Sequence, residues 1–226
     1  MPGPVGRHVD LDLSGRHALV CGASGGIGRA AAISLAELGA NITVIARRAD
    51  QLNGLRPILK NAGAGESHAL VADLEKRDDL KAKVAAHLEK TGPVHILLNN
   101  TGGPPSGPLL EAKEEDFLKP YGRHLLAAHL LTQLVVPGMK QAGYGRIVNV
   151  LSSSVREPIP GLGVSNTIRV AMASWAKSYR VKSLSGRIDP SFRAFPPKHA
   201  AHSVGLRGGL SATIPLLKLS ASPLGA

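Results

Sequence analysis

The sequence of 226 residues predicts an α/β protein in which a parallel sheet lies between two layers of helices. Three observations support this fold class. Apolar, β-branched runs recur along the chain, helix-like segments separate them, and a glycine-rich turn joins the first run to the first helix. Strands that alternate with helices form parallel sheets covered on both faces. We therefore expect a three-layer α/β/α architecture with a ligand site at the carboxyl ends of the strands.

The first strand and the first helix flank the glycine-rich turn. Residues 16–21 (RHALVC) form a short apolar run, and Ile27, Ala31 and Leu35 follow at helical spacing until Gly39. A short apolar run followed by a 3.6-residue period is typical of a buried strand that leads into an amphipathic helix. The sequence therefore predicts a strand, a tight turn and a helix over residues 16–39.

The turn itself has the sequence CGASGGIG over residues 21–28. Glycine at such a turn lets the backbone bend tightly and lets phosphate oxygens approach main-chain N–H groups at the helix N-terminus. The same sequence is also compatible with a simple connector, since the chain contains 26 glycines. As a phosphate site, the turn would contribute Gly22, Ser24, Gly26, Ile27 and Gly28.

Four further apolar runs continue the alternation of strands and helices. They cover residues 41–46, 67–72, 94–98 and 146–151, with helix-like segments between them. Five strands in this order indicate a Rossmann-like, doubly wound sheet, the architecture that binds dinucleotides at the carboxyl ends of its strands. This repetition strengthens the phosphate-site interpretation of the first turn.

The whole chain is expected to form one domain, residues 1–226, because no Pro/Ser-rich linker divides it into two cores. The first residues lack the apolar run of a signal peptide, and no run of about 18 apolar residues occurs elsewhere, so we expect a soluble cytoplasmic protein without membrane contact. The single cysteine, Cys21, excludes an internal disulfide and is predicted to be a small buried side chain rather than a reactive thiol. No Cys/His cluster has zinc-ligand spacing, so no metal is expected.

The formal net charge of +11 raises the question of nucleic-acid binding. More than half of the excess positive charge lies from Arg180 onward, and no aromatic platform is interleaved with it, since aromatic residues make up only 3% of the chain. Single-stranded nucleic acids are bound by basic grooves with aromatic stacking platforms. The charge distribution therefore favours an ordinary solvated basic surface over a nucleic-acid site.

Arg47 and Arg48 follow the second predicted strand, where dinucleotide-binding folds discriminate between two cofactors. An acidic residue there binds the ribose 2′-OH of NAD, whereas arginine suits the 2′-phosphate of NADP. The pair favours NADP(H) over NAD(H), although adjacent arginines are also common in loops that precede helices. Asp73 ends the third strand and is predicted to cap the next turn, to contact the adenine ring, or to do both.

These motifs resemble the short-chain dehydrogenase/reductase family. The resemblance rests on Gly22-x-x-x-Gly26-x-Gly28, Asp73, Asn99-Asn100-x-Gly102 and the fifth-strand segment 147–152 (IVNVLS), and it covers about residues 12–190. The segment 100–105 (NTGGPP) is most similar to 3-oxoacyl-acyl carrier protein reductases. The resemblance implies an NADP(H)-dependent oxidoreductase for a small carbonyl or acyl substrate, assembled as a homodimer or homotetramer, with Asn99 and Gly102 among the cofactor-binding residues.

The resemblance also implies a catalytic set that this sequence alters. Ser152 stands where the family has its substrate-orienting serine, but Ser165 occupies the position of the catalytic tyrosine, Arg169 that of the lysine and His124 that of an asparagine. A serine hydroxyl is far less acidic than a phenol, and an arginine stays protonated. Arg169 retains the ability to hold a ribose hydroxyl. Tyr121, one turn before His124, remains a second candidate proton donor.

Two functional classes follow from these substitutions. One is an NADP(H)-dependent reductase with altered proton delivery. The other is a pseudoenzyme or regulatory subunit that binds a dinucleotide and lacks the Tyr/Lys pair.

The C-terminal part departs from the alternating pattern. Residues 165–179 predict a helix of about four turns, and residues 180–184 a shortened sixth strand. From residue 190 to 226 prolines and glycines break any period, so this segment is expected to be irregular or disordered and to lack a final strand. A substrate lid, a diverged ending and an altered reading frame are three explanations for this composition.

Overall fold

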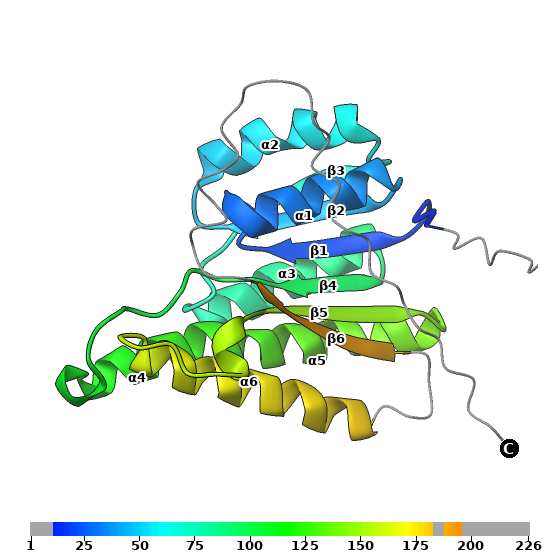
Figure 1. The fold of residues 1–226 in the computed structure, drawn as a ribbon. Coiled ribbons are helices and arrows are strands. Elements are labelled where there is room, and N and C mark those ends of the chain that lie inside the picture. Colours follow the sequence, from blue (N-terminus) through cyan, green and yellow to red (C-terminus); the bar gives the residue numbers. More distant parts are fainter. Residues whose placement is uncertain (1–10, 183–187, 196–226) are drawn as a thin grey trace, which may run out of the picture.

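The computed structural model describes residues 11–182 and 188–195, which form a parallel sheet of six strands between two layers of helices (Figure 1). The strand order is β3-β2-β1-β4-β5-β6. The order reverses between β1 and β4, so the sheet is doubly wound, as a Rossmann-like fold requires. The predicted fold class is confirmed.

Of the six strands, all but the sixth agree with the predicted runs to within two residues. They are β1 (His17–Cys21), β2 (Asn41–Ala46), β3 (Ser67–Val71), β4 (Ile96–Asn99), β5 (Gly145–Ser152) and β6 (Ile188–Phe195). Every neighbouring pair is parallel, with Cys21 opposite Ile45 and Asn99 opposite Asn149 at the carboxyl edge. The turns that follow these strands therefore meet at one edge of the sheet.

The helices connect successive strands. They are α1 (Gly26–Glu37), α2 (Ala49–Ala62), α3 (Arg77–Thr91), α4 (Glu114–Tyr121), α5 (Ala127–Gln141) and α6 (Gly163–Lys182). A π-helical turn, Gly122–Leu126, joins α4 to α5. Such turns are rare and often occur at functional sites, which draws attention to the residues it contains. No helix of the described ranges is long and apolar enough to cross a membrane.

The core consists of two apolar layers, one on each face of the sheet. Ala18 and Val20 of β1 pack with α1 and α2, whereas Leu19 and Cys21 face α3 and α5. Both faces of β1 are covered, which explains why its sequence is continuously apolar and does not alternate. Cys21 is buried as predicted, and its burial raises the pKa of the thiol to about 12.

The predicted sixth strand is wrong in position. Residues 180–182 continue α6, and the sixth strand is Ile188–Phe195, which pairs with β5 along its whole length. Pro190 made this run look irregular, but proline is tolerated in an edge strand because one side of that strand needs no N–H donors. Residues 190–195 therefore belong to the sheet. Residues 196–226 lie outside the described residues, and the prediction that they contain no further strand falls there.

Candidate functional site

A cleft of about 520 Å³ opens at the carboxyl edge of the sheet, between the turn after β1 and the loops after β2, β3 and β4. Eight of the predicted cofactor-binding residues line it: Gly22, Ser24, Gly26, Ile27, Arg47, Arg48, Asp73 and Gly102. The structure thus brings together residues that are up to 80 positions apart in sequence. This position agrees with the general rule for ligand sites in doubly wound sheets.

The glycine turn has the geometry that a phosphate group requires. Gly22 and Gly26 have φ values of +61° and +53°, a region that favours glycine. A Cβ on Gly25 or Gly26 would meet no atom within 4 Å, so bare backbone faces open space. No side chain caps the N-terminus of α1 at Gly25. Free N–H groups at a helix N-terminus beside bare backbone fit an anionic phosphate.

Gly28 has a packing role behind this turn. A Cβ at this position would overlap the carbonyl oxygen of Gly22 and approach Asn100 Nδ2 to 2.8 Å. Only glycine therefore lets α1 lie this close to the end of β1. The residue shapes the phosphate turn without lining the cleft itself.

The two arginines after β2 lie at the mouth of the cleft. Both are exposed, and Arg48 Nη2 donates to Ser24 Oγ at 3.4 Å, which places its guanidinium beside the phosphate turn. Asp73 accepts a hydrogen bond from the Glu75 N–H at 3.0 Å, so its predicted capping role is confirmed. Asp73 also lines the cleft.

Asn99 is the last residue of β4, and the side chain of the adjacent Asn100 points to the other side. Asn99 is buried and donates to Asn149 Oδ1 at 2.9 Å, joining β4 to β5. Asn100 lines the cleft and donates to the Gly22 carbonyl at 3.3 Å. Successive side chains alternate across a strand, so only one of the two can face the ligand side. The structure gives that place to Asn100, whereas the sequence pointed to Asn99.

Ser152 and Ser165 lie at the end of β5 and in the first turn of α6. Ser152 Oγ accepts a hydrogen bond from the Ser154 N–H at 3.2 Å. Ser165 is only 8% exposed. Within residues 11–182, no side-chain hydrogen bond joins either serine to Arg169 or His124. The serines are therefore not part of a preformed proton-transfer chain.

Arg169 lies one helical turn after Ser165, as predicted, and its guanidinium is turned toward β5. Nη1 donates to the Val150 carbonyl at 2.9 Å, while Nε is buried without a partner. Among the described side chains no carboxylate forms an ion pair with it. Burial, and then the nearby charge of Arg123, lower the pKa of Arg169. A buried cation with a free donor suits the binding of a polar ligand group.

His124 occupies the π-helical turn and is 5% exposed. Its Nδ1 lies 2.6 Å from Thr101 Oγ1. Burial, followed by the positive charges of Arg169 and Arg123, lowers the pKa of His124 to about 3, and only a hydrogen bond with the Gly102 backbone opposes this shift. The imidazole is therefore neutral at pH 7, so it lacks the acidic proton of an imidazolium and keeps one N–H as a hydrogen-bond donor. Tyr121, the other candidate donor, is a partly exposed residue at the end of α4.

Two cleft residues, Thr101 and Arg123, were not predicted from the sequence. Arg123 forms an ion pair with Glu75 at 3.1 Å and donates to the Gly103 carbonyl at 3.3 Å, which ties the π-helical turn to the loops after β3 and β4. Both residues line the cleft. Thr101 occupies the unspecified position of the motif Asn99-Asn100-x-Gly102, whereas Arg123 belongs to no sequence motif and its partners are distant in sequence.

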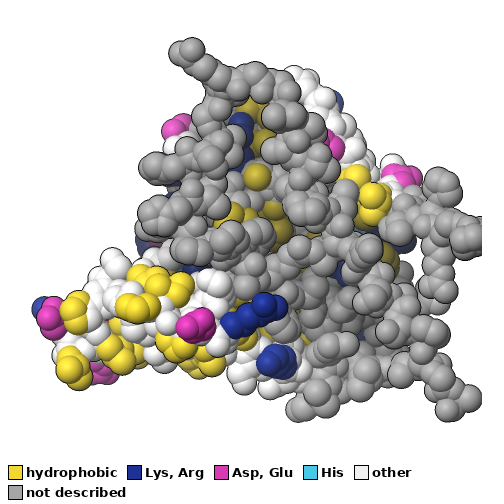
Figure 2. All heavy atoms as spheres, in the orientation of Figure 1, with side chains coloured by type: hydrophobic (Ala, Val, Ile, Leu, Met, Phe, Trp, Pro, Cys, Tyr) yellow, Lys and Arg dark blue, Asp and Glu magenta, His cyan; other side chains and the backbone are white. Residues whose placement is uncertain are grey.

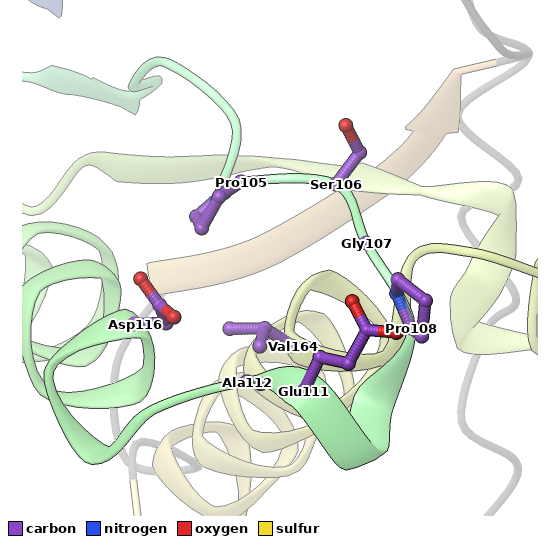
Figure 3. Close-up of a pocket in the computed structure, with 8 residues that line it drawn as sticks. All are labelled: Pro105, Ser106, Gly107, Pro108, Glu111, Ala112, Asp116 and Val164. Carbon is purple, nitrogen blue, oxygen red and sulfur yellow. The ribbon is translucent and has the colours of Figure 1, made fainter.

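A smaller pocket of about 160 Å³ lies between residues 105–108 and the first turns of α4 and α6. Figure 3 shows Asp116 and Val164 facing one another across it, with Glu111 and Pro108 at its rim. The pocket wall is fixed by a hydrogen bond from the Gly107 N–H to the Gly161 carbonyl at 2.8 Å. Val164 precedes Ser165, so this pocket adjoins the candidate catalytic residues. In the part of the chain that the structure describes, no group of His, Cys, Asp and Glu has an arrangement that could hold a metal ion.

The family model for short chain dehydrogenases matches residues 16–188. The chain therefore belongs to the short-chain dehydrogenase family, and the family-level resemblance noted in the sequence is confirmed.

Individual relatives are more distant. A short chain dehydrogenase of Pseudocercospora fijiensis is 35% identical over 150 residues, which cover 66% of this chain and 48% of the relative. A ketoacyl reductase of Nostoc sp. is 29% identical over 168 residues, which cover 74% of this chain and 58% of the relative. The chain thus spans about half the length of these curated relatives.

Among solved structures, L-sorbose reductase from Gluconobacter frateurii, complexed with NADPH and L-sorbose, superimposes with a TM-score of 0.76. The sequence identity is 27%, and the match covers 80% of this chain and 68% of the reductase. This similarity agrees with the doubly wound fold.

Proposed function

We propose that the chain binds NADP(H) in the carboxyl-edge cleft and acts as an oxidoreductase on a carbonyl or alcohol substrate. The observation that carries the proposal is the uncapped N-terminus of α1, whose bare glycine turn lies beside Arg48. The turn provides N–H donors for a phosphate, and the arginines provide charge for a second one at the 2′ position. NADPH in the related L-sorbose reductase supports the same choice of cofactor.

The bound dinucleotide would supply the hydride chemistry. Toward that ligand, Asn100, Gly102 and Asp73 would form the cleft walls, and the unpaired Nε–H of Arg169 would hold a ribose hydroxyl. Ser152, at the end of β5, would orient the substrate oxygen. The ketoacyl reductase of Nostoc sp. and the segment 100–105 support a 3-oxoacyl-type substrate.

A second candidate function is dinucleotide binding without turnover. The neutral His124 and the replacement of the Tyr/Lys pair by Ser165 and Arg169 favour it, since none of these groups is a suitable acid at pH 7. Hydride transfer from NADPH to a panel of keto compounds, measured by absorbance, separates the two functions. Turnover that Ser152→Ala abolishes supports the oxidoreductase; NADPH binding without any turnover supports the pseudoenzyme.

Cofactor choice is tested by replacing Arg47 and Arg48 together with alanine. Charge-assisted hydrogen bonds contribute roughly 1.5–3 kcal/mol, so the Kd for NADPH should rise about tenfold to a hundredfold. The Kd for NADH, which lacks the 2′-phosphate, should change little. Binding is measured by NADPH and NADH fluorescence, with Arg56→Ala in α2 as an exposed control. Equal weakening of both nucleotides would contradict the 2′-phosphate assignment.

We also propose that the chain assembles as a homodimer or homotetramer through α4 and α6. Leu118 and Val170 are exposed on these helices, and Figure 2 shows apolar side chains gathered over the region of α4. Leu131 of α5 is instead buried in the core, so this helix serves the interior of the protein at that position. Analytical ultracentrifugation of the wild type and of Leu118→Glu tests the assembly.

A further inference from the structure

Thr101 forms a wall between two hollows. On one side it lines the dinucleotide cleft, and on the other it lines a cavity of about 10 Å³ behind β4. The cavity is also lined by Asn99, Arg123 and His124. A cavity of this size has room for about one water molecule. Thr101 thus connects the ligand side of the site to a buried polar interior.

The proton of the Thr101 hydroxyl is directed into the protein. A neutral imidazole has one donor and one acceptor nitrogen. If the nearer nitrogen of His124 accepts, Thr101 donates to it across 2.6 Å. If that nitrogen carries the proton instead, Nε2 of His124, 3.0 Å from Oγ1, can accept in its place, and the Gly102 carbonyl at 3.3 Å is a further acceptor. In either tautomer, Oγ1 offers the cleft a lone pair and no proton.

The polar groups behind Thr101 do not need its hydroxyl. Asn99 Oδ1 and Arg123 Nε are buried without partners, and both residues line the small cavity. One is an acceptor and the other a donor, so a single water can receive a hydrogen bond from Arg123 and donate one to Asn99. The lone pair of Thr101 therefore remains available to a ligand in the cleft.

We propose that Thr101 binds a hydroxyl group of the cleft ligand by accepting a hydrogen bond from it, and that His124 is the positioning residue that fixes the Thr101 hydroxyl. The inference rests on the proposed function. The ligand group must be a donor, which excludes a substrate carbonyl oxygen. A ribose hydroxyl of the dinucleotide and the alcohol group of a substrate share this chemistry, and the experiment distinguishes them.

The test compares Thr101→Val, which keeps the side-chain shape and removes the hydroxyl, with Thr101→Ser, which keeps the hydroxyl. In the first arm, the Kd for NADPH alone is measured by fluorescence. In the second arm, binding of a 3-hydroxyacyl thioester, the alcohol form of the proposed substrate, to the NADP⁺-loaded protein is measured by calorimetry. A net hydrogen bond corresponds to about a fivefold change in Kd. A fivefold rise in the Kd for NADPH with Thr101→Val identifies a ribose hydroxyl as the partner of Thr101. A rise confined to the second arm identifies the alcohol group of the substrate. In either case Thr101→Ser should bind as the wild type does.

The role of His124 is tested by a double-mutant cycle. His124→Phe should weaken the same arm as Thr101→Val, and the double variant should be no weaker than Thr101→Val alone, because the two residues act through one hydroxyl. Additive losses would show that His124 acts independently and would overturn its positioning role. Thermal unfolding of each variant identifies any that fail to fold. If a His124 variant fails, the difference in Kd between Thr101→Val and Thr101→Ser alone tests whether the Thr101 hydroxyl binds the ligand.

Failure of this inference differs from failure of the proposed function. If the wild type does not bind NADPH, both are wrong. If the wild type binds NADPH and Thr101→Val matches it in both arms, only the inference about Thr101 is wrong.

Discussion

Buried polar groups have hydrogen-bond partners at the amino end of the sheet, whereas several at the carboxyl end lack them. Toward the amino ends of the strands, the fully buried hydroxyl of Thr43 lies 2.7 Å from His17 Nε2 and 2.8 Å from His87 Nε2. Toward the carboxyl ends, buried polar atoms of the described residues lack partners: Asn99 Oδ1, Arg123 Nε, Asn149 Nδ2, Ser154 Oγ and Arg169 Nε. Each unpaired buried group costs about 1–3 kcal/mol.

This difference suggests separate roles for the two ends: the amino end stabilises the fold, and the carboxyl end contacts the ligand. Polar groups at the amino end satisfy one another and hold β1, β2 and α3 together. Those at the carboxyl end leave hydrogen-bonding capacity that a ligand or water can use, at a cost to the folded state. At the carboxyl end the unpaired groups lie in and around the candidate site, whereas the paired groups at the amino end form a structural cluster.

The largest effect is expected from Gly28→Ala at the carboxyl end. The new Cβ would overlap the Gly22 carbonyl oxygen, and overpacking of this kind costs roughly 1–3 kcal/mol. Because the turn must shift to relieve the overlap, NADPH binding should also be lost. The measurements are urea unfolding and NADPH fluorescence.

Gly54→Ala in α2 is the matched control. A Cβ there would meet nothing within 4 Å, so this variant should bind NADPH normally and gain about 0.5–1 kcal/mol from helix propensity. Wild-type affinity in Gly28→Ala would mean that the turn does not position the ligand.

The amino end should make the protein sensitive to acid. Burial, followed by the neighbouring His87, His68 and His95, lowers the pKa of His17 to about 4, and Glu66 opposes the shift. The unfolded chain therefore binds more protons than the folded one between pH 6.5 and 4, and stability falls as the pH falls through this range. For His17 the loss amounts to roughly 3 kcal/mol.

His17→Gln should reduce this pH dependence, because glutamine can still hydrogen-bond Thr43 and does not titrate. Urea unfolding at several pH values between 7 and 4 measures the slope. His129→Gln, which removes an exposed histidine, serves as the control and should keep the wild-type slope. If both variants have the same slope as the wild type, burial of His17 does not govern the acid sensitivity.

The sequence predicted the parts of the site that depend on local patterns. The apolar run of β1, the glycine turn and the arginine pair after β2 are contiguous, and each has a local physical signature. The polar contacts at both ends are not local, since Thr101 meets His124 across 23 positions and Thr43 meets His87 across 44. No period or composition encodes such pairings.

The same limit applies to the two asparagines after β4 and to the misplaced sixth strand. Which of Asn99 and Asn100 faces the cleft depends on the residue at which β4 ends, and a sequence motif does not specify that residue. The strand β6 contains Pro190, which suggests a loop unless it is known that β6 lies at the sheet edge.

Thr43→Val should destabilise the paired end by about 1–3 kcal/mol. Valine fills the same space, but the side chains of His17 and His87 lose a buried partner, and each unpaired group carries a desolvation cost. Urea unfolding at pH 7 gives the change in the free energy of unfolding. An unchanged midpoint would show that water replaces the hydroxyl and that the cluster does not stabilise the fold.

Thr132→Val should have the smallest effect and the opposite sign. Thr132 lies in α5 and is as fully buried as Thr43, but its Oγ1 has no partner in the described part of the chain. Replacing this hydroxyl by a methyl group removes a desolvation cost without breaking a hydrogen bond, so a gain of up to about 1 kcal/mol is expected. The same urea measurement applies. If Thr132→Val destabilises as much as Thr43→Val, the loss of any buried hydroxyl is costly here, and the contrast between paired and unpaired polar groups does not explain stability.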